Sequence, residues 1–300
     1  MEYFLELTLS GLTRGSIYAL IALGYTMVYG IIQLINFAHG EVYMIGAFVA
    51  LIVAGVLTIY GFSGVSILVL AALIAIIYAA AYGYTLERIA YRPLRGAPRL
   101  SPLISAIGMS LFLQNYVLLA QTPDFLPFPE LIPEFDFMEP IAHIMGSAEL
   151  IILVVTVITM IALTLLIKYT RIGKAMRATQ QDMVMARLVG VNVDNVISVT
   201  FIIGSILAAI GGVLVGSYIG QINYFIGFMA GVKAFTAAVL GGIGNIPGAV
   251  LGGIVLGLAE SMAAGYISSA YEDVFAFGVL VLILVLRPAG LLGKAVKQKV

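Results

Sequence analysis

The stretch Arg171–Asn195, RIGKAMRATQQDMVMARLVGVNVDN, is the only long polar passage in the second half of a strongly apolar chain. Small or apolar residues recur in it at helical spacing, among them Met176, Met183 and Ala186. This pattern predicts an amphipathic helix outside the bilayer, with one face available to another surface. Because the flanking segments almost lack charge, we expect membrane spans on both sides of this helix.

The composition excludes a soluble domain. Of the 300 residues, 62% are hydrophobic and 10% are charged, and the mean hydropathy is +1.10. Soluble domains average roughly 45–50% apolar and about 25% charged residues. Apolar runs of about 17–25 residues, enough to cross a hydrocarbon core of ~30 Å, recur along the chain. The predicted fold class is an all-α polytopic membrane protein, with a single transmembrane domain over residues 1–300 in contact with membrane lipid.

Nine apolar segments are candidate spans. The seventh is too short for a full crossing at 1.5 Å per residue, so a broken or re-entrant helix is the alternative, and we expect eight to nine transmembrane helices. The segments are Leu12–Tyr29, Val42–Val56, Ser66–Thr85, Leu103–Leu119, Leu150–Ile167, Val196–Ile219, Met229–Leu240, Val250–Ser268 and Val274–Leu286.

Charge placement predicts the orientation. Thirteen of the fifteen basic residues fall in three clusters, which the positive-inside rule places in the cytoplasm. They are Arg88, Arg92, Arg95 and Arg99; Lys168, Arg171, Lys174, Arg177 and Arg187; and Arg287, Lys294, Lys297 and Lys299. Ten of the fifteen acids lie elsewhere, at Glu2, Glu6, Asp124, Glu130, Glu134, Asp136, Glu139, Glu149, Glu272 and Asp273. We therefore expect the N-terminus outside and the C-terminus inside.

Two polar segments connect the spans at opposite faces of the membrane. The cytoplasmic segment covers about residues 168–195, and the outer loop covers about residues 121–148. The outer loop is rich in proline and acid, so we expect an ordered cap or a docking surface. His143 ends this loop and is expected to be a surface histidine rather than a metal ligand.

Several chemical motifs are absent from the sequence. Cysteine does not occur, and His39 and His143 are the two histidines, so neither a disulfide nor a metal site is predicted. There is no phosphate-binding loop, no H-E-x-x-H and no G-x-S-x-G motif. No catalytic residue is therefore predicted, and the zero net charge gives no indication of nucleic acid as a partner. The chain can form a pathway but contains no recognisable source of energy.

A weak internal repeat links the two halves of the chain. GSIYA at Gly15–Ala19 recurs as GSILA at Gly204–Ala208, and the polar pattern of Tyr29–Phe37 recurs in Tyr218–Phe225. The first copy lies in the first candidate span and the second copy in the sixth, five spans further along, so the second copy would cross the membrane in the opposite direction. Inverted repeats are typical of transporters; chance matching among apolar residues is the alternative.

Polar residues at two breaks between spans are candidates for a pathway or gate, because polar groups at membrane depth are costly unless they face protein or water. The segment Gln33–Glu41 joins the first two spans without a long loop; alternatively, it is an interfacial turn in which Asn36 is the N-cap of the second helix. The segment Gly241–Ala249 forms either a sharp turn or a broken helix. The candidates are Gln33, Asn36, His39, Glu41, Gln221, Asn223, Gly241 and Asn245.

Lys233 and Glu260 are isolated charges in the apolar last third of the chain. An unpaired charge there would be expensive, so a mutual ion pair between the two side chains is one hypothesis.

Four blocks of sequence resemble one known family. They are Gly15–Phe48, Gly173–Gly216, Lys233–Gly253 and Leu286–Gly293, spread in order over nearly the whole chain. Together they are similar to the branched-chain amino acid ABC transporter permeases of the LivH type. The outer loop is not closely matched.

The resemblance implies a multi-pass subunit of a prokaryotic inner membrane that forms the pathway for leucine, isoleucine and valine. The implied partners are a second related permease, two cytoplasmic ATPases that carry ATP and Mg²⁺, and a periplasmic or surface-anchored amino-acid-binding protein. The coupling helix of the family carries over to Arg177, Ala178, Asp182, Ala186 and Gly190, and Gly190 fits a helix C-terminal cap. Urea, short amides or simple sugars are alternative cargoes, and a self-powered secondary transporter is an alternative mechanism.

Overall fold

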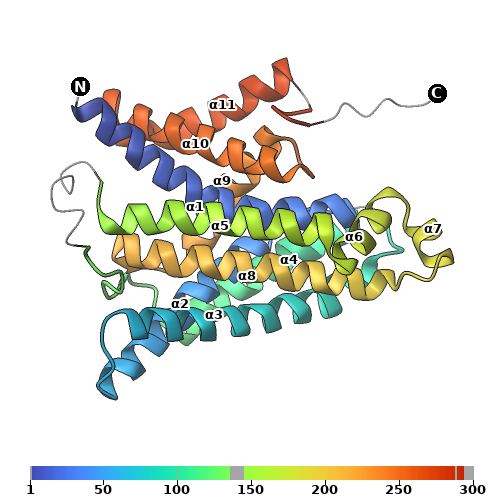
Figure 1. The fold of residues 1–300 in the computed structure, drawn as a ribbon, viewed down its shortest axis with the longest axis horizontal. Helices are drawn as coiled ribbons and strands as arrows, with labels where there is room; N and C mark the ends of the chain where they lie inside the picture. Colours follow the sequence, from blue (N-terminus) through green and yellow to red (C-terminus); the bar gives the residue numbers. More distant parts are fainter. Residues whose placement is uncertain (1, 99, 136–144, 288, 294–300) are drawn as a thin grey trace.

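The structure is a computed structural model that describes residues 2–98, 100–135, 145–287 and 289–293 (Figure 1). Within these residues the chain is almost entirely helical. The α-helices are α1 (Glu2–Ile32), α2 (His39–Ile59), α3 (Val65–Leu86), α4 (Leu100–Ala120), α5 (Ser147–Tyr169), α6 (Arg171–Gln181), α7 (Met183–Leu188), α8 (Val193–Ile219), α9 (Ile226–Gly241), α10 (Ile246–Tyr266) and α11 (Glu272–Leu286). A π-helical turn η1 (Glu87–Tyr91) and a 3₁₀ turn η2 (Arg92–Leu94) extend α3, and a 3₁₀ turn η4 (Ser269–Tyr271) precedes α11.

Eight helices in the described part of the chain are long and apolar enough to cross a membrane. The shorter α9, with 16 residues, corresponds to the predicted short seventh segment. These helices confirm the predicted all-α polytopic membrane fold. Two short strands, β1 (Leu126–Pro127) and β2 (Gln221–Ile222), pair antiparallel and attach the outer loop to the end of α8.

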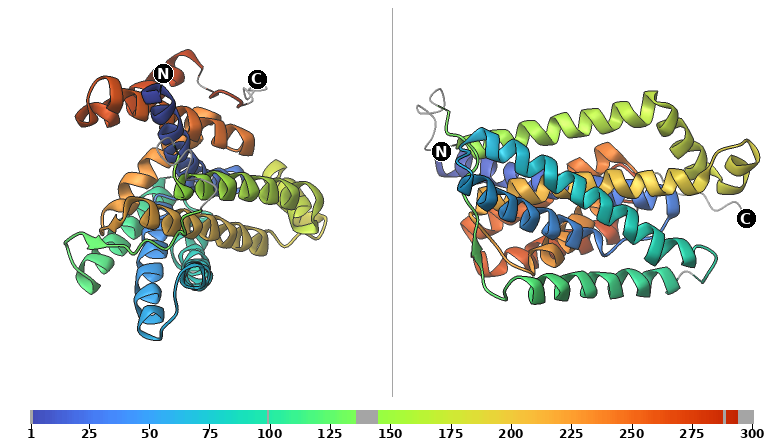
Figure 2. Two further views of the ribbon diagram at one scale, coloured as in Figure 1. Left: turned by 60° about the vertical axis from the view of Figure 1, so that its left-hand side comes forward. Right: turned by 90° about the horizontal axis from the view of Figure 1, so that it is seen from below.

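The bundle has a buried centre and apolar outer helices. α1 and α8 are the most buried spans, whereas α3, α4, α5 and α11 are the least buried. Figure 2 shows α4 and α5 on opposite sides of the bundle. Because the exposed side chains on these helices are largely apolar, they suit contact with lipid or with another membrane subunit.

The charged segments gather at the two ends of the bundle, as Figure 1 shows for α6 and α7 at one end and the N-terminus at the other. At the α7 end, Arg92 and Arg187 both approach Asp194. At the opposite end, Glu6, Glu130, Glu134 and Glu149 line one pocket. The separation of charge is thus visible in the structure, and the assignment of the α7 end to the cytoplasm stays a prediction of the positive-inside rule. Asp136, Glu139, His143, Arg99 and the last three lysines lie outside the described residues.

The segment predicted to be cytoplasmic forms two helices, α6 and α7, so the prediction of one continuous helix over Arg171–Asn195 is wrong. Asp182 has an extended backbone (φ −160°, ψ 112°) between α6 and α7, and its side chain accepts from the backbone N–H groups of Val184 and Met185. A short carboxylate that bonds nearby N–H groups favours a helix start over a helix interior. Gly190 follows α7 with φ +86°, which agrees with the predicted C-terminal cap.

The two copies of the sequence repeat have the same local architecture. Each consists of a long helix, a linker of equal length (residues 33–38 and 220–225) and a second helix. α1 and α8 pack antiparallel, since Gly24 approaches Gly204 and Ile21 approaches Gly211. This arrangement agrees with copies that run in opposite directions, as an inverted repeat requires.

The buried side chain of His39 fills a notch between α1 and α8. A Cβ on Gly24 would lie 2.5 Å from Cε1 of His39 and 3.2 Å from the carbonyl oxygen of Gly204. The absence of a side chain at this position therefore allows α1, α2 and α8 to meet.

We predict that Gly24→Ala lowers the thermal stability of the purified protein, because overpacking of this kind costs about 1–3 kcal/mol. The measurement is the temperature at which half of the protein is lost from the monodisperse peak in size-exclusion chromatography. The matched control is Gly55→Ala, where an added Cβ meets nothing within 4 Å. Equal stability of the two variants would contradict this description of the helix crossing.

Candidate functional site

The linker between α1 and α2 places three of the predicted polar residues inside the bundle. Asn36, His39 and Glu41 are all buried, whereas Gln33 is exposed and has a positive φ of +53°. Asn36 is not the N-cap of α2, because Ala38 occupies that position. Its side chain instead accepts a hydrogen bond of 2.6 Å from the hydroxyl of Tyr91, in the π-helical turn that ends α3. The long-range bond to Tyr91 replaces the predicted local cap.

Glu41 lies in the first turn of α2, at the positive end of the helix, as predicted. One carboxylate oxygen accepts from Ser110 of α4 at 2.9 Å, and the other has no hydrogen-bond partner among the described residues. His39 Nε2 is likewise buried without a partner in the described structure. Buried polar groups usually have a hydrogen-bond partner. This part of the bundle therefore contains polar atoms that remain available for further hydrogen bonds.

The other four predicted pathway residues lie at the ends of helices or beside a cavity. Asn223 accepts from the N–H of Phe225 just before α9, and Asn245 is the N-cap of α10, where it accepts from Gly248 N–H at 3.2 Å. Gly241 packs directly on Gly248. These three residues therefore have local structural roles, and Gln221 borders the cavity described below.

Lys233 and Glu260 are brought together, with Nζ 3.2 Å from a carboxylate oxygen. Lys233 also lies 2.7 Å from Asp273 and 3.9 Å from Glu272, both at the start of α11. Glu272 in turn pairs with Arg14 of α1 at 3.0 Å. The hypothesis of a pair thus becomes a cluster of five charged groups that connects α1, α9, α10 and α11.

Sequence reasoning missed Arg14, although the sequence contains a signal for it. Arg14 and Lys233 are the two basic residues that fall outside the three basic clusters. Arg14 follows the first residue of α1 by 12 positions, which is about 18 Å along the helix. A cation within a membrane-spanning helix is by default a candidate for a functional role.

A cavity of about 380 Å³ lies against this charge cluster and is the candidate functional site. Arg14, Lys233 and Glu272 form its charged wall. Aliphatic side chains from α1, α8 and α9 form the opposite lining, including Ile17, Val215, Ile219 and Met229. An apolar pocket with a few convergent polar groups is the usual form of a small-molecule site.

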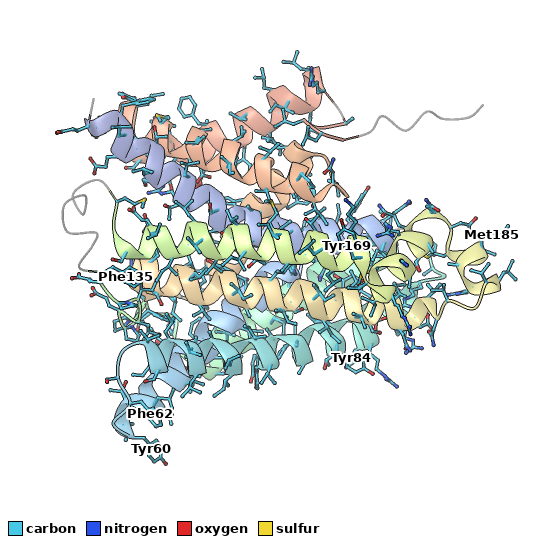
Figure 3. The ribbon with its side chains drawn as sticks, in the orientation of Figure 1. Tyr60, Phe62, Tyr84, Phe135, Tyr169 and Met185 are labelled. Atoms are coloured by element: carbon cyan, nitrogen blue, oxygen red, sulfur yellow. The ribbon has the colours of Figure 1, made fainter. Side chains whose placement is uncertain are left out.

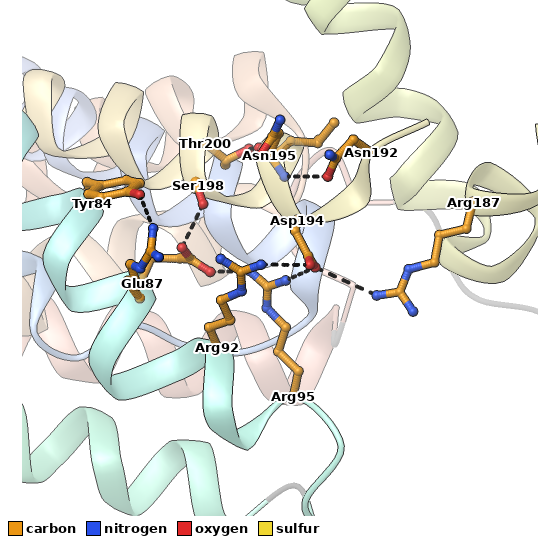
Figure 4. Close-up of polar contacts among 12 residues, drawn as sticks. Tyr84, Glu87, Arg92, Arg95, Arg187, Asn192, Asp194, Asn195, Ser198 and Thr200 are labelled. Atoms are coloured by element: carbon orange, nitrogen blue, oxygen red, sulfur yellow. Dashed lines mark hydrogen bonds and ion pairs between the residues drawn. The ribbon is translucent and has the colours of Figure 1, made fainter. Parts of the chain in front are cut away.

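The α7 end of the bundle has a second charge network, shown in Figure 4. Glu87 is fully buried in η1, where it accepts from Arg95 and, at 2.7 Å, from Ser198 of α8. Arg95 also donates to Asp194, and Arg187 of α7 lies 3.8 Å from the same carboxylate. Asp194 of α8 therefore forms direct ion pairs with Arg187 of α7 and with Arg92 and Arg95, and Arg95 in turn pairs with Glu87 of η1.

The five predicted coupling residues stabilise their own segment. Arg177 donates to the backbone carbonyls of Ile167 and Lys168 at the end of α5, Asp182 caps α7 and Gly190 ends it. Ala178 lies on α6 and Ala186 is buried in α7. The apolar face seen in the sequence therefore packs inward, because Met176, Thr179 and Ala186 are all buried.

The exposed apolar surface of this segment is at the end of α7 and was not predicted. We call it the α7 tip, and it consists of Val184, Met185, Leu188 and Val189, which are 59–78% exposed. Figure 3 shows Met185 at the far end of the molecule. Four large apolar side chains exposed beyond the membrane-spanning helices form a surface suited to a protein partner.

Comparison with known proteins agrees with the geometry. Residues 7–284 match the family described as branched-chain amino acid transport system, permease component. The chain is 50% identical to the high-affinity branched-chain amino acid transport system permease protein LivH of Escherichia coli, over 99% of this chain and 98% of that protein. It is 52% identical to BraD of Pseudomonas aeruginosa, over the same shares.

A relative that belongs to the import system for a different compound is less similar. The autoinducer 2 import system permease protein LsrC of Yersinia enterocolitica is 33% identical, over 47% of this chain and 40% of that protein. The match to the permease family covers most of the chain, and the chain therefore belongs to the family of branched-chain amino acid transport system permeases.

Proposed function

We propose that this protein is a permease subunit of an ATP-driven importer and forms part of the pathway for branched-chain aliphatic amino acids. The observation that carries the proposal is the identity of about half of all residues to LivH and BraD over nearly the full length of each. The partners are a second related permease, two ATPases that bind ATP and Mg²⁺, and a substrate-binding protein that delivers the cargo at the acidic end of the bundle.

The α7 tip supports a docking site for an ATPase. It combines exposed apolar side chains with the nearby basic residues Lys174 and Arg187, and the sequence has no phosphate-binding loop of its own. Aliphatic side chains of this kind insert into pockets of a partner as the core of an interface. An ATPase that moves this tip has a direct mechanical connection to the membrane helices through Arg187 and Asp194.

The connection continues toward the buried linker between α1 and α2. Glu87 and Tyr91 lie one turn apart in η1, and Tyr91 donates to Asn36 of the linker. π-helical turns inside α-helices are frequent at functional sites. A shift of α7 would therefore act on η1 and, through Tyr91, on the polar segment that the sequence suggests as a gate.

Amino acids are favoured over other cargoes by both the comparisons and the cavity. The autoinducer 2 permease matches less than half of the chain. An aliphatic lining next to an Arg–Glu pair also suits a zwitterion with a branched side chain, whereas urea and sugars present no charges to it.

The complete assembly is expected to import leucine into proteoliposomes only when ATP is available to the ATPases. The test compares uptake of radiolabelled leucine by the five-part assembly with ATP, by the assembly without ATP and by this chain alone. Uptake at the full rate by this chain alone would contradict the proposal and favour a self-powered transporter.

Substitution of the α7 tip is expected to reduce binding-protein-stimulated ATP hydrolysis at least about tenfold, because a buried hot-spot side chain contributes about 2 kcal/mol or more. The variant is Leu188→Asp, and the measurement is ATP hydrolysis with saturating binding protein and leucine. The matched control is Ile59→Asp, an exposed aliphatic residue that ends α2; its neighbour Tyr60 lies far from Met185 in Figure 3. Wild-type stimulation in Leu188→Asp would place the ATPase contact elsewhere.

A further inference from the structure

We propose that the cavity beside Arg14 binds the charged head group of the amino acid during its passage. In this subsite Arg14 holds the carboxylate of the cargo, Glu272 holds its ammonium group, and the aliphatic wall holds its side chain. The inference rests on the proposed function and deepens it, because it names the residues that recognise the cargo within the membrane.

Arg14 and Glu272 are the charged residues that combine partial exposure with a position in the cavity wall. Their side chains are 38% and 29% exposed, whereas that of Lys233 is 10% exposed. Arg14 uses Nη1 for Glu272. A guanidinium has five N–H donors in a planar fork, and that fork matches a carboxylate in two parallel hydrogen bonds.

A zwitterion can replace the Arg14–Glu272 contact without changing the charge of the cluster. The carboxylate and ammonium of an amino acid present the same two charges in the opposite order. One internal ion pair of 3.0 Å is thereby exchanged for two ion pairs to the ligand. This exchange avoids the cost of leaving a charge unpaired away from water, whereas a ligand with only one of the two charges does not.

Lys233 is a positioning residue in this arrangement. Its Nζ forms ion pairs with Asp273 at 2.7 Å and Glu260 at 3.2 Å, and Tyr18 donates to the other oxygen of Glu260 at 2.7 Å. These contacts fasten the start of α11 to α9 and α10. They hold Glu272 beside the cavity while Lys233 itself is occupied by acids of the protein.

The remaining walls fit a branched aliphatic side chain. Ile17, Val215, Ile219 and Met229 line the cavity, and its volume of about 380 Å³ lies in the range of ligand pockets, about 300–1,000 Å³. A hydrophobic wall opposite a charge pair orients the ligand, because each end of the amino acid has one favourable place.

The absence of cysteine from the chain allows a direct test by thiol accessibility. Met229→Cys places one thiol in the cavity wall, and Ile219→Cys is an independent second position. The assembled transporter is treated with a membrane-impermeant maleimide, and labelling of this chain is measured by mass spectrometry. The probes are leucine, 3-methylbutylamine, which lacks the carboxylate, and 4-methylpentanoate, which lacks the ammonium. Ser63→Cys, in an exposed loop, is the control that leucine should not protect.

Leucine is expected to slow labelling of the two cavity cysteines, and both analogues are expected to be at least about tenfold weaker protectors, since a charge-assisted hydrogen bond contributes about 1.5–3 kcal/mol. Arg14→Gln should remove the preference for leucine over the amine, and Glu272→Gln should remove the preference over the acid. In Arg14→Lys, which keeps the charge and loses the fork, leucine should protect at a concentration between those needed for the wild type and for Arg14→Gln.

The outcomes separate this inference from the proposed function. An assembly that imports leucine but shows no protection at either cavity position overturns the subsite. Protection with unchanged selectivity in Arg14→Gln and Glu272→Gln overturns the assignment of these two residues. An assembly that does not import leucine at all contradicts the proposed function instead.

Discussion

The structure depends on a cluster of five charged groups where four apolar helices meet. Two cations and three acids, Arg14, Lys233, Glu260, Glu272 and Asp273, form one connected cluster between α1, α9, α10 and α11. Charges at membrane depth are expensive unless they pair or face water. The cluster meets this constraint by mutual contacts on one side and by a cavity on the other. The same constraint that positions these helices therefore leaves a cavity with a charged wall between them.

Two polar networks connect the α7 end of the bundle to the buried linker between α1 and α2. Near the α7 tip, Asp194 of α8 pairs with Arg187 of α7 and with Arg95, and Arg95 pairs with Glu87 of η1. From η1, Tyr91 reaches Asn36 in the linker before α2, and the first turn of α2 carries Glu41. Alternating access needs elements with more than one stable arrangement, and a π-helical turn between two charge-bearing helices is a natural candidate for such an element.

Much of the architecture follows from the sequence, because lipid imposes a simple rule on composition. The spans, the short α9 and the separation of acidic and basic ends were all predictable from runs of apolar residues and from the placement of charge. Two predicted details failed, one because of a contact between distant residues and one because of a local side-chain bond. Asn36 bonds Tyr91 rather than capping α2, and the bond of Asp182 to the N–H groups of α7 divides the predicted helix. Arg14 could have been noticed as an isolated cation, but its partner Glu272 is 258 residues away, so its role required the fold.

The central claim is that a branched-chain amino acid passes between Arg14 and Glu272. The most direct measurement is a structure of the complete transporter, with its ATPases and binding protein, trapped with leucine in the membrane region. The account predicts density for leucine in the cavity, with the carboxylate at Arg14, the ammonium at Glu272 and the isobutyl group against Ile17 and Val215. Leucine bound elsewhere in the membrane region, with the Arg14–Glu272 pair still closed at 3.0 Å, would contradict it.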